Sequence, residues 1–150
     1  MSPVALMVDS YGSLNAVSLE TTSAIGWQGP VAVGTATLVP GSPVAVFQQS
    51  ATVFTALMVD QDGMLNSASL DTSSATGWQG PVAVGTATLV PGSPVTVIPQ
   101  ASAVFAALMV DRGGTLNVAT LDTSAGTGWK GPVGVGNARL FPGSRIASAM

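Results

Sequence analysis

Three tryptophans recur at a fixed spacing and are the side chains best suited to hold a ligand. They stand at positions 27, 78 and 129, each inside a Gly-Trp-Gln/Lys-Gly-Pro-Val segment. An indole presents a broad apolar face that can stack on a sugar ring, while nearby carboxylates and amides bind the hydroxyls of that ring. The structural alternative is that each indole packs between adjacent repeats and positions the outer strand of its own repeat.

Polar side chains accompany each tryptophan at equivalent places. A Gln or Lys follows the indole directly, and an acidic residue opens the loop that precedes it. Such groups can bind the hydroxyls of a sugar whose ring lies on the indole. The sugar-binding set that we expect is Trp27, Trp78, Trp129, Gln28, Gln79, Lys130, Glu20, Asp71 and Asp122.

A second repeated set of polar residues is expected to be structural. The carboxylate that begins each Asp-x-x-Gly turn is suited to cap backbone N–H groups within that turn. These carboxylates are Asp9, Asp60 and Asp111. An asparagine inside the strand that follows each turn is expected to bond a neighbouring turn. These asparagines are Asn15, Asn66 and Asn117.

The residue types argue against catalysis. The chain has no His and no Cys, which excludes a thiol nucleophile, a His base and an ordinary zinc or copper site. Paired carboxylates could hydrolyse a glycosidic bond, but here one acidic position is repeated without a supporting set of His, Arg or Tyr. We expect a protein that is not an enzyme and that has no catalytic residues, metal or cofactor.

Charge is sparse along the whole sequence. Its 150 residues include four basic and seven acidic ones, a net charge of −3, and 47% of the residues are apolar. This balance disfavours nucleic acid and anionic lipid surfaces as partners. The apolar runs are far shorter than the roughly 20 residues of a membrane span, and no signal peptide is visible. We expect a soluble protein, cytoplasmic or non-classically exported, that binds glycans and further copies of itself.

An internal repeat of 51 residues organises the chain as one module of three units, about 1–48, 49–99 and 100–150. Residues 26–44 are identical to residues 77–95. Each unit predicts four short strands and no helix, which in the second unit fall at 43–47, 53–60, 64–70 and 78–84.

Two details of these strands select an architecture. The second strand is apolar on both faces at 56–59, as expected where a sheet is covered on both sides. The fourth contains Pro81, which belongs on a sheet edge because it cannot donate to a ladder. We therefore predict an all-β fold, a β-propeller with three four-stranded blades per chain. A two-sheet sandwich is the alternative, but it does not explain a regular repeat.

Three blades are too few to close a ring, since propellers typically have about 4–8 blades. The sequence begins with strands two to four of a blade and ends at 144–150 with a lone first strand, which we expect to complete the first blade of another copy. All four basic residues lie in the third repeat, whereas every charged residue of the first two repeats is acidic. This difference in charge suits a head-to-tail contact between copies. We predict a homodimer of six blades, with a trimer of nine as the alternative.

The motif order within each repeat resembles a known class of proteins. Asp-x-x-Gly-x-Leu is followed by Leu-Asp/Glu and then by Gly-Trp-x-Gly-Pro-x-x-Val-Gly. This order is similar to the blades of PLL-like and tectonin-like β-propeller lectins. The resemblance implies glycan binding in clefts repeated around the ring. The alternative is a ligand-free, self-assembling scaffold, engineered or excised from a longer repeat protein, which the exact duplication of residues 26–44 favours.

Overall fold

The computed structural model describes residues 3–20, 24 and 26–149, without the side chain of Glu20. Within these residues it contains only strands, and it shows no helix that could cross a membrane. The strands are β1 (Val4–Val8), β2 (Leu14–Glu20), β3 (Gly26–Ala32), β4 (Ala45–Gln48), β5 (Val53–Val59), β6 (Leu65–Asp71), β7 (Trp78–Ala83), β8 (Thr96–Ala101), β9 (Val104–Val110), β10 (Leu116–Asp122) and β11 (Trp129–Val135).

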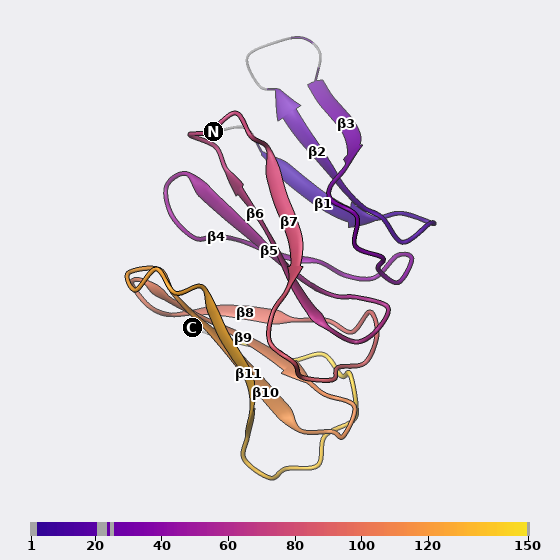
Figure 1. The fold of residues 1–150 in the computed structure, drawn as a ribbon, viewed down its shortest axis with the longest axis vertical. Coiled ribbons are helices and arrows are strands. Elements are labelled where there is room, and N and C mark those ends of the chain that lie inside the picture. The colour runs from indigo at the N-terminus through magenta and orange to yellow at the C-terminus, as the bar shows by residue number, and fades with distance from the viewer. Residues whose placement is uncertain (1–2, 21–23, 25, 150) are drawn as a thin grey trace.

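The strands form three antiparallel meanders, each of which is one blade of a propeller. The first blade has the order β1-β2-β3, the second β4-β5-β6-β7 and the third β8-β9-β10-β11. Figure 1 shows the three sheets side by side along the long axis of the molecule. The four strands predicted in the second unit are confirmed within two residues as β4 to β7. The all-β propeller architecture is thereby confirmed.

Short-range hydrogen bonds set the hairpin that joins the second and third strands of each blade. In the second blade, Asp60 Oδ1 accepts from the backbone N–H groups of Asp62 and Met64, both at 2.9 Å. Asn66 Nδ2 donates to Asp60 Oδ2 at 2.8 Å. The same Asp–Asn bond recurs in the other two blades. The structural interpretation of these aspartates and asparagines is therefore confirmed.

The hydrophobic core lies between blades rather than within one of them. Alternate residues of β5 point to opposite neighbours, because side chains alternate along a strand. Ala56 and Met58 pack against the first blade, whereas Leu57 and Val59 pack against the third. We call the contact between the first and second blades the first junction, and that between the second and third blades the second junction.

The outermost strand of each blade is β3, β7 or β11. Each of them pairs with one strand only, and β7 carries Pro81 at this edge as predicted. The innermost strands β4 and β8 of adjacent blades lie near each other. The first blade has three strands in the described part of the chain, so β1 is its free inner edge.

The segment 144–149 was predicted as a strand but forms no ladder in the single chain. It lies beside β8, where the Thr96 hydroxyl donates to the carbonyl oxygen of Ile146 at 2.7 Å. This segment corresponds through the repeat to β4 and to β8. The one hydrogen bond between this segment and β8 that the structure describes comes from a side chain, so the segment does not extend the edge of the third sheet at β8.

Candidate functional site

Each tryptophan lies at the start of an outermost strand. The register pairs Trp27 with Leu19, Trp78 with Leu70 and Trp129 with Leu121. Trp78 packs against the core of the first junction and Trp129 against that of the second. Trp27 is 57% exposed, because no blade covers its side of the first blade. The predicted packing between blades is therefore seen at two of the three positions.

A hollow of about 340 Å³ opens at the first junction beside Trp78. It is lined by Val4, Ala16, Val17, Ser18, Gln28, Gly29, Val31, Leu70 and Trp78. A second hollow of about 320 Å³ adjoins it. This one is lined by Ala16, Val31, Ala32, Val33, Gly34, Thr76, Gly77 and Trp78. Since Trp78, Ala16 and Val31 line both, the indole stands in the wall of a single groove between two blades.

The groove combines residues from two repeats. Trp78 comes from the second blade, whereas Gln28, Ser18 and the backbone of Gly29 come from the first. The side chain that directly follows Trp78 in the sequence, Gln79, is exposed and donates to the carbonyl oxygen of Thr76 at 3.1 Å. The side-chain amide that lines the groove with the Trp78 indole is therefore that of Gln28 on the preceding blade, not that of Gln79.

Two of the predicted acidic residues, Asp71 and Asp122, accept hydrogen bonds from groups within their own loops. Asp71 Oδ1 accepts from the hydroxyl of Ser73 at 2.6 Å and from its backbone N–H at 2.9 Å. Asp122 Oδ1 makes the same two bonds to Ser124. Neither carboxylate is among the residues that line the two hollows. The side chain of Glu20, the third predicted member, lies outside the described residues.

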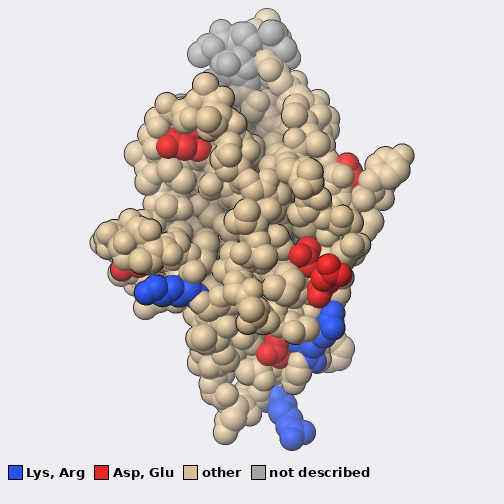
Figure 2. All heavy atoms as spheres, in the orientation of Figure 1, with Lys and Arg blue, Asp and Glu red and all other residues tan. Residues whose placement is uncertain are grey.

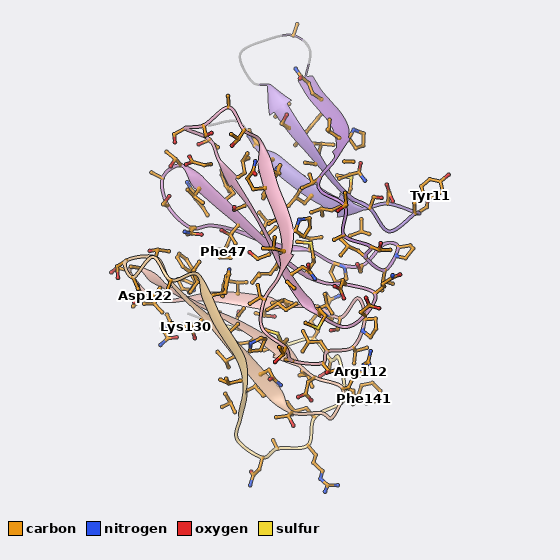
Figure 3. The ribbon with its side chains drawn as sticks, viewed as in Figure 1. Tyr11, Phe47, Arg112, Asp122, Lys130 and Phe141 are labelled. Carbon is orange, nitrogen blue, oxygen red and sulfur yellow. The ribbon has the colours of Figure 1, made fainter. Side chains whose placement is uncertain are left out.

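The electrostatics of these loops are set by hydrogen bonding. The Ser73 side chain and backbone hold the pKa of Asp71 below its ordinary value of 3.8. The pKa of Asp122 is lowered mainly by the Ser124 side chain and, to a lesser degree, by the charge of Lys130. Figure 3 shows Asp122 and Lys130 close together at the edge of the third blade. Among the described residues no group of three acidic side chains could hold a metal ion.

The apolar lining of the groove was not predicted from the sequence. Val4, Ala16 and Val31 look like ordinary strand residues, and only the packing of two blades brings them together with Trp78. The period of two along each strand could have assigned these three to one face of the first blade. No signal in the sequence shows that this face meets Trp78 of the next repeat.

Comparison with known proteins shows the same architecture in solved structures. No family model matches the chain, and no curated protein matches it. The BP39L lectin from Burkholderia pseudomallei is 30% identical with a TM-score of 0.78, and the match covers 91% of this chain and 38% of that one.

The second similar structure is a variant of the Aleuria aurantia lectin AAL in complex with Fucalpha1-6GlcNAc. It is 16% identical with a TM-score of 0.55, and the match covers 91% of this chain and 41% of that one. The chain thus spans about two fifths of each solved chain. Over nearly all of its own length, the chain is a run of β-propeller blades that resembles the blades of β-propeller lectins.

Proposed function

We propose that the protein binds carbohydrate, without catalysis, in the grooves between adjacent blades. The observation that carries the proposal is the groove at the first junction, where half-buried Trp78 faces Gln28 and Ser18 of the preceding blade. An indole supplies the stacking face for a sugar ring, and the amide and hydroxyl supply polar contacts to its oxygens. The similarity to two β-propeller lectins supports the same function.

The dimensions of the groove favour a small ligand. A hollow of about 340 Å³ lies at the lower end of the range of ligand pockets, about 300–1,000 Å³. It suits one sugar ring, with neighbouring rings extending over the second hollow. A single shallow site of this kind binds weakly, so useful affinity comes from several sites engaging one glycan-bearing surface together.

The blade faces at the two ends of the chain support assembly with further copies. Leu38 bridges Asp60 of the next blade, and Leu89 bridges Asp111 in the same way. Leu38 and Leu89 are 1% and 0% exposed, whereas Leu140, their counterpart on the third blade, is 38% exposed. Asp9, the counterpart of Asp60 and Asp111, lies on the first blade.

A second repeated contact gives the same result. Val39 packs against Gly92 of the next blade, and Val90 packs against Gly143. Phe141, the counterpart of Val39 and Val90, is exposed (Figure 3). Gly41 is the counterpart of Gly92 and Gly143, and no atom lies within 4 Å of a Cβ added at Gly41. Figure 2 shows the visible basic side chains over the third blade, away from the acidic first repeat.

We therefore propose a ring in which the third blade of one copy packs on the first blade of another. A heterologous contact of this kind stops growing when its rotation closes. Two copies give six blades, within the usual range for propellers, and three copies give nine. Segment 144–149 of one copy then adds to β1 of the next by backbone pairing.

A ligand-free scaffold is the second candidate function. The exact duplication of residues 26–44 as 77–95 favours it, because two identical units can be kept for packing alone. In that case Trp78 serves only to fill the first junction. The two candidates differ in whether the groove binds any sugar.

A glycan array distinguishes them. The wild-type protein and a Trp78→Ala variant are labelled and applied at matched concentrations, with Gln79→Ala as a control, because Gln79 bonds its own loop and lines neither hollow. We expect the wild type to bind a subset of the glycans and Trp78→Ala to lose that binding, while circular dichroism stays unchanged. No binding by a well-folded, fully assembled wild type would favour the scaffold. Release of dye from chromogenic glycosides would instead indicate an enzyme.

A further inference from the structure

The two junctions within the chain differ at one aromatic side chain. Phe47, near the end of β4, lies at the second junction (Figure 3). Its ring centroid is 4.8 Å from that of Phe105 and 6.0 Å from that of Trp129, which it meets edge-on at 87°. Trp129 is the counterpart of Trp78, so Phe47 packs on the indole that corresponds to the one in the groove.

The position of Phe47 coincides with that of the hollow at the first junction. Val4 and Trp78 line that hollow, and their counterparts one repeat later are Thr55 and Trp129. Phe47 is paired across the ladder with Thr55 and contacts Trp129. Thr55 is only 2% exposed, so the Phe47 ring lies beside a covered Thr55 within its own blade and against Trp129 of the next.

The residue at this position varies among the repeats. Position 47 is Phe, position 98 is Ile and position 149 is Ala. In the ring proposed above, segment 144–149 of a second copy lies on β1 in the register of β4 on β5. Since Phe47 pairs with Thr55, that register sets Ala149 opposite Val4. A methyl group there leaves the hollow beside Trp78 open.

We propose that Phe47 closes the second junction to sugar, and that the first junction, with Ala149 of a second copy at the same place, holds the open site. This inference rests on the proposed carbohydrate binding and names the residue that decides which junction binds. The repeated sites are then unequal. One chain contributes an open groove at Trp78 and a closed one at Trp129, and the groove at the seam between copies is bounded by Ile98.

A test that needs no sugar measures the accessibility of each indole. Single-tryptophan proteins are made with Trp78 alone (Trp27→Phe, Trp129→Phe) or with Trp129 alone (Trp27→Phe, Trp78→Phe). Acrylamide is expected to quench Trp78 more strongly than Trp129. Phe47→Ala should raise the quenching of Trp129 to the level of Trp78, whereas the matched control Ile98→Ala should leave it unchanged. Phe47→Ile, which copies the residue of the third repeat, provides a milder variant if Phe47→Ala folds poorly.

A second test uses sugar. Calorimetric titration with Fucα1-6GlcNAc is expected to give one more site per chain in Phe47→Ala than in the wild type. The reciprocal variant Ala149→Phe should lose the site at the first junction.

The outcomes of the two tests separate the two proposals. Quenching that changes as expected, with no sugar bound by any variant, supports the proposal that Phe47 covers Trp129 at the second junction and contradicts the proposed function. Sugar binding whose stoichiometry is the same in the wild type, Phe47→Ala and Ala149→Phe would overturn this inference and leave the proposed function standing.

Discussion

Gly85 gives a direct measure of how closely the blades pack. Its φ is +66°, and a Cβ added there would overlap the carbonyl oxygen of Gly131 and lie 2.9 Å from Cδ of Pro132 on the next blade. Carbon atoms normally approach no closer than about 3.5 Å. Gly136 occupies the equivalent position one repeat later with φ +70°, and nothing lies within 4 Å of its added Cβ.

Gly85→Ala and Gly136→Ala both strain the backbone, but only Gly85→Ala also overpacks the second junction. A left-handed backbone costs an L-residue about 1–2 kcal/mol, and this applies to both positions. Overpacking adds about 1–3 kcal/mol at Gly85 alone. Gly85→Ala should therefore lower the free energy of unfolding by about 2–5 kcal/mol, and Gly136→Ala by about 1–2 kcal/mol. In a domain of this size, each kcal/mol lowers the melting temperature by about 2–4 °C.

The assay is thermal unfolding followed by circular dichroism, at a protein concentration low enough to keep the chains apart. Gly136→Ala should then melt above Gly85→Ala. At high concentration, Gly136→Ala should weaken association, because Gly136 meets Pro30 of the next copy in the proposed ring. Equal melting temperatures for the two variants would refute the face-to-face packing of the second and third blades.

Three further predictions follow from the contacts. Asn66→Ala removes the bond to Asp60 and should lower the free energy of unfolding by about 1–3 kcal/mol, measured in urea; an unchanged midpoint would contradict that role. Hydrogen bonds lower the pKa values of Asp71 and Asp122 below 3.8. The stabilisation that these bonds give the folded state is therefore present above pH 3.8 and is lost as the pH falls through the lowered pKa values. Below pH 3.8, the double variant Asp71→Asn, Asp122→Asn should lose less stability than the wild type. Light scattering at high protein concentration should give about twice 14.8 kDa, and deletion of 144–150 should give the single-chain mass. A single-chain mass for the intact chain at every concentration would refute the ring.

The strands were predictable because their signals are local. The turn at Asp60 is closed by bonds that reach no further than Asn66, and Pro81 excludes its strand from the middle of a sheet. Both features can be recognised within a few residues of sequence. The same locality explains why three repeats of similar sequence give three similar sheets.

The candidate site was less predictable because it lies between blades. Gln28 and Trp78 are distant in sequence and come together only when two sheets pack. The role of Phe47 likewise depends on its contact with Trp129 of the next blade. The predicted carboxylate Asp71 bonds its own loop through Ser73, and sequence alone could not separate that use from sugar binding.

The most direct measurement of the central claim follows the indole N–H signals of Trp27, Trp78 and Trp129 by NMR during a titration with each glycan retained on the array. Each signal is assigned by its loss in the matching Trp→Phe variant. We expect the Trp78 signal to shift and saturate, while the Trp129 signal, shielded by Phe47, stays in place. Binding that leaves the Trp78 signal unmoved, or the absence of any shift with every glycan, would contradict a carbohydrate site at the first junction.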